Sequence, residues 1–314
     1  ALCVVFPRHP TVDESGYVRL LADHYAIPLH TYEQTANPLA DLDRWTKLAD
    51  GPYPGGSLAE YEEDFLLARK LGRPTILTGE HAEFLIAFQW NVLDHYLSHG
   101  RWSAARRELA LRRARGWPYW RLARLAVRSI TPDSILVATD RMRGLRPPRV
   151  PGWIEASMAT LEEPVPVRER WLQTQLGAFI GPGVSLEAEE VCQAVCRVQS
   201  RKPWTDVDLW EFFLSLPAEQ KFPDLRSKAL VRDLLRGRVP DAILDRTDKT
   251  VFDAAALTKI DYAILRRYLG GADYRMPGVD YGQLGELLER QSLTALDYMW
   301  ARSLATVHAF LSNW

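Results

Sequence analysis

The sequence has 314 residues, of which 47% are hydrophobic and 25% are charged, and its formal net charge is −1. This composition is typical of a globular protein with one large domain or two modest ones. The balanced charge gives no overall attraction to nucleic acid or acidic membranes, and no run of 18 apolar residues predicts a transmembrane helix.

Three cysteines, Cys3, Cys192 and Cys196, are too few for a disulfide framework, which indicates a reducing compartment. We therefore expect a cytoplasmic protein. Cys192 and Cys196 are spaced to share one helix face, and no histidine or further cysteine stands near them. We expect buried structural thiols there, with a metal site as the alternative.

The first part of the chain alternates between strand and helix patterns. The predicted strands and amphipathic helices cover residues 1–6, 13–26, 27–33, 57–72 and 74–79, in the order strand, helix, strand, helix, strand. Such alternation predicts an α/β fold with a doubly wound parallel sheet, whose ligands bind beyond the carboxyl ends of the strands. Gly79 lies at such an end, so we expect a ligand there. Because the chain begins inside a strand and without methionine, we also expect the natural polypeptide to extend upstream.

The middle of the chain differs in character. Residues 101–129 hold nine arginines and no lysine, and an irregular linker over 143–152 follows. The arginines could bind an anionic partner such as an acidic peptide or RNA. We favour a packed helical hairpin, because arginine stems cover apolar surface well. From residue 185 onward the pattern is helical, and the last predicted helix covers 282–311.

These patterns divide a single domain into three parts. We expect residues 1–92 to form an α/β part that carries the ligand site, 93–185 a variable helical segment rich in arginine and tryptophan, and 186–314 a large, mainly helical part.

Two dense polar blocks stand on either side of the arginine segment, at residues 78–83 and 200–253. In the second, Lys228 and Arg232 are one helical turn apart and should project from one face, and Lys249 follows in a loop rich in aspartate. Two lysines and an arginine near an acidic turn would suit a polyphosphate with its metal ion. The alternative is solvated surface charge.

Four short motifs occur in these blocks. The turn after the last strand is TGEHAEF (78–84), and RKPWTDVDLWEFFLSLP begins at Arg201. KALVR begins at Lys228, and VPDAILDRTDK ends at Lys249. In order and spacing they are similar to SGEGGDE, RxPFLDxxLxEFxxxLP, KxxLR and LPxxIxxRxK of the asparagine synthetase family. That family also contains β-lactam synthetases and lasso-peptide macrolactam cyclases. The resemblance covers residues 1–92 and 186–265.

The resemblance implies an ATP-pyrophosphatase-like sheet on which ATP and Mg²⁺ bind. Family members adenylate a carboxylate and let an amine attack the acyl-AMP to form an amide. The implied site consists of Val5, Thr78, Gly79 and Glu80 at the ATP, Glu83 as metal ligand, and Lys228 and Lys249 as catalytic lysines at the phosphates. Asp206 and Arg201 would organise the helix behind the site.

The sequence departs from the family pattern in three ways. The SGGxDS pyrophosphate loop, which precedes a strand like residues 1–6, is absent, so an N-terminal strand–loop unit is missing from this chain. The glutaminase domain is absent as well. Within the turn, His81 and Ala82 replace small or glycine residues, Glu83 replaces aspartate and Phe84 replaces glutamate. Glycine permits positive φ, which histidine and alanine resist.

The altered turn, the segment rich in tryptophan and arginine, and the PWTD variant of PFLD resemble the lasso-peptide cyclases. We expect a macrolactam cyclase of peptide natural-product biosynthesis. Its partners would be a precursor peptide, a leader-binding protein and a peptidase. The alternatives are an asparagine synthetase, another amide ligase such as a β-lactam synthetase, or a non-catalytic scaffold that retains the fold.

Overall fold

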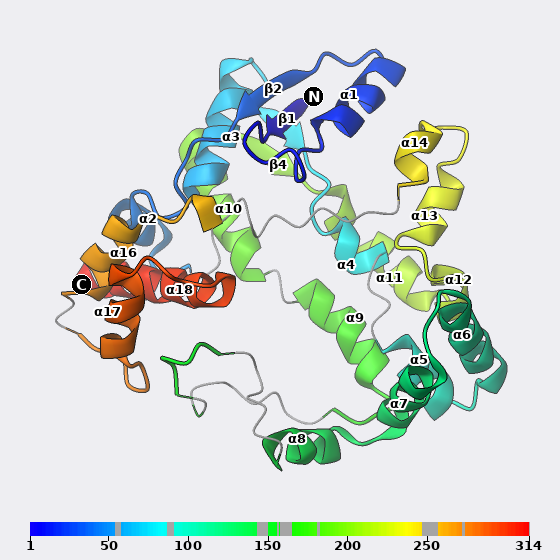
Figure 1. Ribbon diagram of the computed structural model, residues 1–314. Coiled ribbons are helices and arrows are strands. Elements are labelled where there is room, and N and C mark those ends of the chain that lie inside the picture. Colours follow the sequence, from blue (N-terminus) through cyan, green and yellow to red (C-terminus); the bar gives the residue numbers. More distant parts are fainter. Residues whose placement is uncertain are drawn as a thin grey trace.

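The computed structural model of the protein describes residues 1–53, 58–86, 91–142, 150–155, 157, 165–180, 183–246, 257–271 and 274–313. It is a mixed α/β structure in which helices predominate (Figure 1). The strands are β1 (Leu2–Val5), β2 (His30–Glu33), β3 (Thr75–Leu77) and β4 (Gln199–Arg201).

The helices before residue 150 are α1 (Ser15–His24), α2 (Leu42–Ala49), α3 (Leu58–Lys70), α4 (Ala82–Ile86), α5 (Val92–Ser98), α6 (Trp102–Ala114), α7 (Tyr119–Ile130) and α8 (Asp133–Met142). Those after it are α9 (Arg170–Ile180), α10 (Gly183–Cys196), α11 (Val207–Ser215), α12 (Ala218–Lys221), α13 (Ala229–Leu234), α14 (Asp241–Leu244), α16 (Tyr262–Leu269), α17 (Tyr281–Glu289) and α18 (Ala295–Ser312), with a 3₁₀ helix η2 (Pro203–Thr205).

The strands form two small parallel sheets. β1 pairs with β2, with Leu2 opposite His30, and α1 makes the crossover between them. β3 pairs with β4, with Thr75 opposite Gln199. The predicted strands and helices of the first 79 residues are therefore confirmed, although each strand is shorter than its pattern.

The expectation of one doubly wound sheet is not met in the described residues, where each sheet has two strands. Leu77 of β3 is 74% exposed, whereas strands of doubly wound sheets are covered on both faces. β4 was also missed, because its sequence, Gln-Ser-Arg, has no apolar residue and lies where a helical pattern was expected. Its pairing with β3 comes from tertiary contact rather than from strand propensity.

The β3–β4 sheet lies beside a core formed between α3 and α10. Its buried members include Phe65 of α3 and Cys192 and Cys196 of α10. The two sulfur atoms are 4.0 Å apart, and burial raises the pKa of the Cys192 thiol. Both cysteines are therefore the inert, buried structural thiols expected from their spacing.

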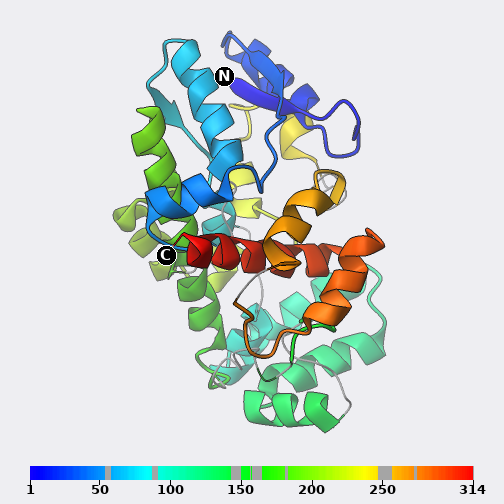
Figure 2. The same ribbon diagram turned by 90° about the vertical axis from the view of Figure 1, so that its left-hand side faces the viewer.

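A second core gathers the C-terminal helices around α18. In Figure 2, α18 (red) crosses the molecule with α2 and α16 packed against it. Trp153, 1% exposed, lies in this core and donates from its indole Nε1 to Asp297 Oδ1 at 3.0 Å. Asp297 also completes a capping box with Thr294 at the start of α18.

The single long helix predicted over 282–311 is wrong, because the chain breaks between α17 and α18. Gln291 adopts φ 50°, in the left-handed region that ends helices. The capping box at Thr294 then begins a new helix.

The arginine segment folds as the expected helical hairpin. Helices α6 and α7 pack on each other and on α5, and Figure 1 shows this group beside α12. Arg112 pairs with Glu108 at 2.6 Å, and the guanidinium groups of Arg112 and Arg121 lie over the Trp117 ring. Several arginines are thus held within the fold. No helix in the described residues has the length and apolar character needed to cross a membrane.

Candidate active site

The candidate site begins where β3 ends. Pairing with β4 extends one residue beyond the strand, because the Thr78 amide donates to the Arg201 carbonyl at 3.0 Å. Gly79 follows, and an added Cβ there would meet nothing within 4 Å. His81 has φ 66°. The turn therefore has a positive φ at a histidine, at a cost of about 1–2 kcal/mol.

The Thr78 hydroxyl is the unusual group of this turn. Its Oγ1 is buried, and it has no hydrogen-bond partner among the residues that the structure describes. A buried hydroxyl without a partner costs about 1–3 kcal/mol. An unpartnered polar atom next to an open glycine is the arrangement that a polar ligand would satisfy, so Thr78 and Gly79 fit the expected nucleotide.

Glu80 is held from two sides. Its Oε2 lies 3.1 Å from Lys202 Nζ, and its Oε1 accepts from the Tyr61 hydroxyl at 3.3 Å. Lys202, whose side chain is 8% exposed, also pairs closely with Glu189 of α10. One buried ammonium thus joins the turn to α10. Because one lysine charge faces two carboxylates, Lys202 is needed to keep both acids in place.

The surroundings shift two neighbouring pKa values. Burial, reinforced by the charge of Glu80, raises the pKa of the Tyr61 hydroxyl. Burial and the charge of Lys202 lower the pKa of His81. At neutral pH, His81 is therefore a neutral imidazole and Tyr61 a protonated phenol.

Glu83 and Lys228 bring the two polar blocks together. Lys228 Nζ lies 3.1 Å from Glu83 Oε1, and both side chains are partly exposed. Lys228 is the N-cap of α13 and has φ 60°, a left-handed conformation rare in lysine. The convergence expected from the motifs is thus present for this pair.

Arg232 lies one helical turn after Lys228, whose carbonyl accepts from the Arg232 amide at 2.9 Å, but its guanidinium group bonds backbone carbonyls. Its Nε donates to the Ser227 carbonyl at 2.8 Å, and its Nη1 donates to the Leu244 carbonyl.

Asp206 has the structural role expected of it. Its side chain caps α11 by accepting from the Leu209 amide at 2.9 Å. Arg201 contributes its backbone carbonyl to the turn, and its side chain bonds Gln199 within β4.

One predicted residue lies in the other sheet, and a second falls outside the described residues. Val5 lies opposite Glu33 in the other sheet, and its contact with ATP stays a prediction. Lys249 lies outside the described residues. Among the described residues no group of three or more histidines, cysteines or acids could hold a metal ion. Glu83 alone would therefore have to act with oxygen atoms of a bound substrate.

Sequence reasoning missed Lys202, Tyr61 and Glu189. Lys202 stands directly after β4, at the x of the RxPFLD pattern. This position is the one feature of the sequence that could have pointed to it. Tyr61 and Glu189 lie within helices, where neither residue type nor spacing marks them.

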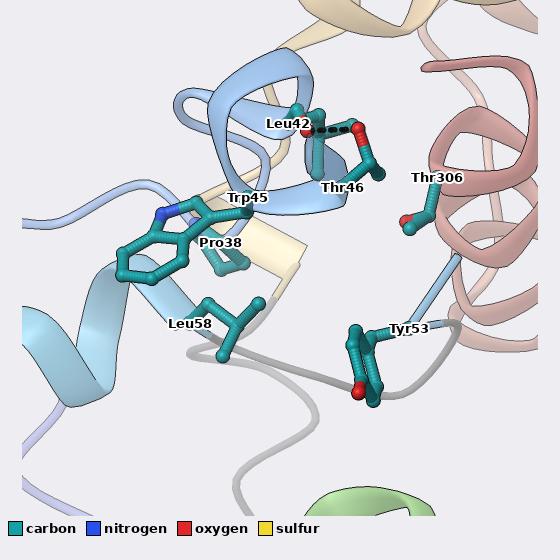
Figure 3. A pocket seen from close by; sticks show the side chains of 7 residues that line it. All are labelled: Pro38, Leu42, Trp45, Thr46, Tyr53, Leu58 and Thr306. Carbon is teal, nitrogen blue, oxygen red and sulfur yellow. Dashed lines mark hydrogen bonds between the residues drawn. The ribbon is translucent and has the colours of Figure 1, made fainter. Parts of the chain in front are cut away.

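A pocket elsewhere is too small for a nucleotide. It lies between α2, α3 and α18, as Figure 3 shows, with Trp45, Leu58 and Thr306 among its lining residues. Its free volume of about 10 Å³ would hold about one water molecule. The Thr46 hydroxyl beside it is already bonded to the Leu42 carbonyl at 2.8 Å. We therefore assign no role in the reaction to this pocket.

Comparison with known proteins agrees with the motifs. The model of the asparagine synthase family matches residues 1–305. No curated protein and no solved structure matches the chain.

Proposed function

Because the chain belongs to the asparagine synthase family, we propose that its Thr78–Glu83 turn and Lys228 form the ATP site of an amide-bond-forming ligase. Family membership supports ATP-dependent amide-bond formation in general. The observation that carries the proposal is the 3.1 Å pair between Glu83 and Lys228, which unites two motifs distant in the sequence.

In this proposal the Thr78 hydroxyl and the open side of Gly79 bind the nucleoside. The hydroxyl gains the partner that it lacks among the described residues, and the glycine permits close approach of the backbone. A substrate carboxylate would attack the α-phosphorus of ATP and release pyrophosphate, and an amine would then attack the acyl-AMP, lose a proton and release AMP. The chain holds the turn for this purpose through the Glu80–Lys202–Glu189 network.

Lys228 would bind the phosphates and Glu83 a magnesium ion. Mg²⁺ commonly takes one or two carboxylates together with substrate phosphates and water, so a single glutamate is a sufficient protein ligand. The existing ion pair supports this division of roles, because a bound phosphate and its metal ion can replace each partner of the pair.

Lys249 would stabilise negative charge on the reacting acyl group. A tetrahedral intermediate needs a positive charge at its oxyanion, and the compact ammonium of lysine can supply it in a water-poor site. This assignment is supported by the match of Lys249 to the family lysine in RTDK.

Within the family, we assign the chain to macrolactam cyclisation of a precursor peptide. The turn lacks two glycine or small residues and the final glutamate of the family pattern, and PWTD replaces PFLD. The tryptophan- and arginine-rich segment forms a helical hairpin beside α12. These features support a substrate different from aspartate and ammonia.

The full-length protein with ATP, Mg²⁺ and a peptide encoded beside its gene provides the test. A cyclase yields one AMP for each peptide and a product lighter by one water. Asparagine formed from aspartate and ammonia would instead identify an asparagine synthetase. Absence of AMP with every substrate would identify a non-catalytic scaffold and overturn the proposal.

A further inference from the structure

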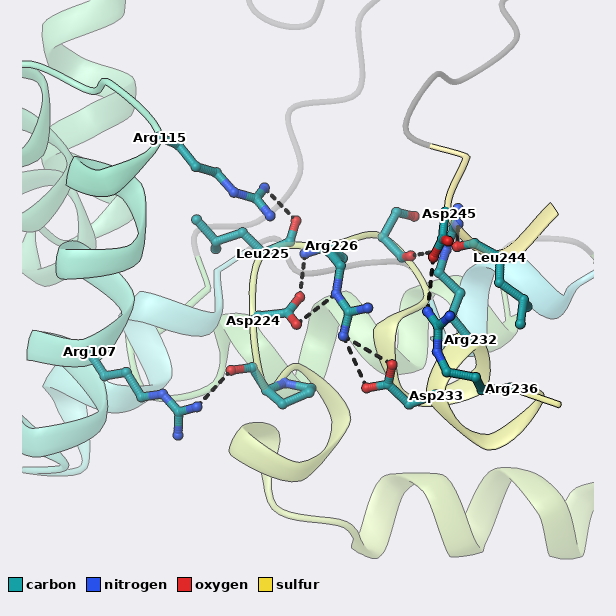
Figure 4. Close-up of polar contacts among 12 residues, drawn as sticks. Arg107, Arg115, Asp224, Leu225, Arg226, Arg232, Asp233, Arg236, Leu244 and Asp245 are labelled. Atoms are coloured by element: carbon teal, nitrogen blue, oxygen red, sulfur yellow. Dashed lines mark hydrogen bonds and ion pairs between the residues drawn. The ribbon is translucent and has the colours of Figure 1, made fainter. Parts of the chain in front are cut away.

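The segment that precedes Lys228 is fastened by arginines. This segment is residues 223–227. Every second carbonyl oxygen in it, those of Pro223, Leu225 and Ser227, accepts a hydrogen bond from a guanidinium group. The donors are Arg107 at 3.1 Å, Arg115 at 2.8 Å and Arg232 at 2.8 Å, respectively. Figure 4 shows Arg107 and Arg115 reaching across from the arginine-rich hairpin.

The same segment is braced along its own length. Arg226 donates to Asp224 at 2.8 Å and to both carboxylate oxygens of Asp233, on α13, at 3.0 and 3.1 Å (Figure 4). Asp224 also accepts from the Arg226 amide at 2.6 Å. This internal bracing fixes the shape of the segment, whereas Arg107 and Arg115 fix its place relative to α6.

Lys228 directly follows this fastened segment. It is the first residue after Ser227, and its left-handed backbone turns the chain into α13. Left-handed lysine is unfavourable, so the surrounding contacts must hold it. The ammonium of Lys228 contacts Glu83, so a shift of residues 223–227 would move Lys228 away from Glu83.

From these contacts we infer that Arg107 of α6 and Arg115, the C-cap of that helix, are positioning residues, which hold Lys228 opposite Glu83 by clamping the backbone before it. The arginine-rich hairpin would thus have a defined task in the site without touching the substrate. Only the role of Lys228 in ATP binding rests on the proposed function. The clamp itself can be tested without it.

The test compares Arg115→Met with Arg106→Met in the full-length protein. Arg106 is exposed on the same helix and makes no hydrogen bond or ion pair with a described residue, so it is a matched control. A water-soluble carbodiimide joins an amine and a carboxylate only when they touch. The yield of the Lys228–Glu83 cross-link, measured by peptide mass spectrometry, therefore reports the position of Lys228.

We expect Arg115→Met to reduce this cross-link severalfold and to raise the KM for ATP about tenfold with little change in kcat, the size of one charge-assisted hydrogen bond. Arg106→Met should change neither quantity. Arg115→Lys, which keeps one donor, should restore part of the cross-link. A melting temperature equal to that of the control would separate positioning from a general loss of stability.

Two other outcomes have distinct meanings. Equal cross-link yields in Arg115→Met and Arg106→Met would overturn the clamp. A reduced yield with an unchanged KM would support the clamp but refute the assignment of Lys228 to the phosphates.

Discussion

Lys228 Nζ lies 3.1 Å from Oε1 of Glu83, and this pair joins the N-terminus of α13 to the first turn of α4, just after the turn that follows β3. Both partners come from family motifs, yet their contact satisfies each charge before any substrate binds. The pair therefore holds the site in one arrangement, and a phosphate with its metal ion would have to separate it.

Replacing Glu83 by glutamine tests the metal assignment. Glu83→Gln removes the charge but keeps the size of the side chain, and we expect Mg²⁺-dependent ATP turnover to fall at least about tenfold. Glu286→Gln is the control, because Glu286 is a surface residue whose side chain is 69% exposed. Unchanged turnover and an unchanged magnesium dependence in Glu83→Gln would remove this residue from the metal site.

Lys202 should matter for stability as well as for the turn. Lys202→Met leaves Glu189, 2% exposed, and Glu80 without their shared cation, and the free energy of unfolding should fall by about 3 kcal/mol. The exposed pair of Arg290 with Glu286 gives the comparison, since Arg290→Met should cost less than about 0.5 kcal/mol. Urea unfolding of both variants measures the difference, and equal losses would contradict the prediction.

Lys249→Met separates binding from chemistry. ATP should still bind and the fold should remain intact, while amide product falls about a hundredfold or more, as expected when one stabilising charge at an oxyanion is removed. Lys70→Met, at an exposed position at the end of α3, is the control. Near-normal product from Lys249→Met would refute the assignment.

Lys221 provides a pH-dependent test of the fold. Burial lowers the pKa of its ammonium to about 8 from the ordinary 10.5. The unfolded chain then binds more protons than the folded one between these values, so this residue destabilises the fold below about pH 8 and ceases to do so above about 10.5.

We therefore expect Lys221→Met to be more stable than the parent at pH 7, by about 1–3 kcal/mol. The advantage should shrink as the pH rises from 8 to 10.5. Urea unfolding of parent and variant across this range gives the difference between their free energies of unfolding, in which the contributions of the other titrating groups cancel. A difference that is constant with pH would show that Lys221 stays charged in the fold, where the Trp171 ring lies 5.6 Å from its ammonium.

The hairpin itself should respond to loss of a single arginine through stability. Arg112→Gln deprives Glu108, 6% exposed, of its partner, and should cost about 1–3 kcal/mol. Arg106→Gln should cost little.

If the hairpin is a packed element, raising the salt concentration will hardly change peptide affinity. A steep loss of affinity with salt would instead indicate that its arginines grip an acidic partner.

Local patterns predicted most elements of the first 79 residues but missed α2. The local pattern of apolar residues located β1, α1, β2, α3 and β3, because this signal lies within a few residues of sequence. The i, i+4 spacing of Cys192 and Cys196 likewise predicted their shared face, whereas the helix-organising role of Asp206 was expected only from the family resemblance.

What the patterns could not supply was contact between distant segments. Lys202 lies in a polar stretch of the sequence, where a lysine is normally expected on the surface. Only the tertiary structure shows that Glu189 and Glu80 lie beside it. The break before α18 was hidden for a different reason. Apolar residues continue on both sides of Gln291, and the periodic signal outweighed the Thr294–Asp297 capping box.

Pairing of β3 with β4 closes the chain into one long loop that contains every helix from α4 to α10. The entropy of closing such a loop grows only with the logarithm of its length, so that doubling it costs about 0.6 kcal/mol. Insertions or deletions among these helices therefore change the free energy of closing the β3–β4 ladder very little. The helices within the loop can vary in length while the turn that follows β3 keeps its geometry.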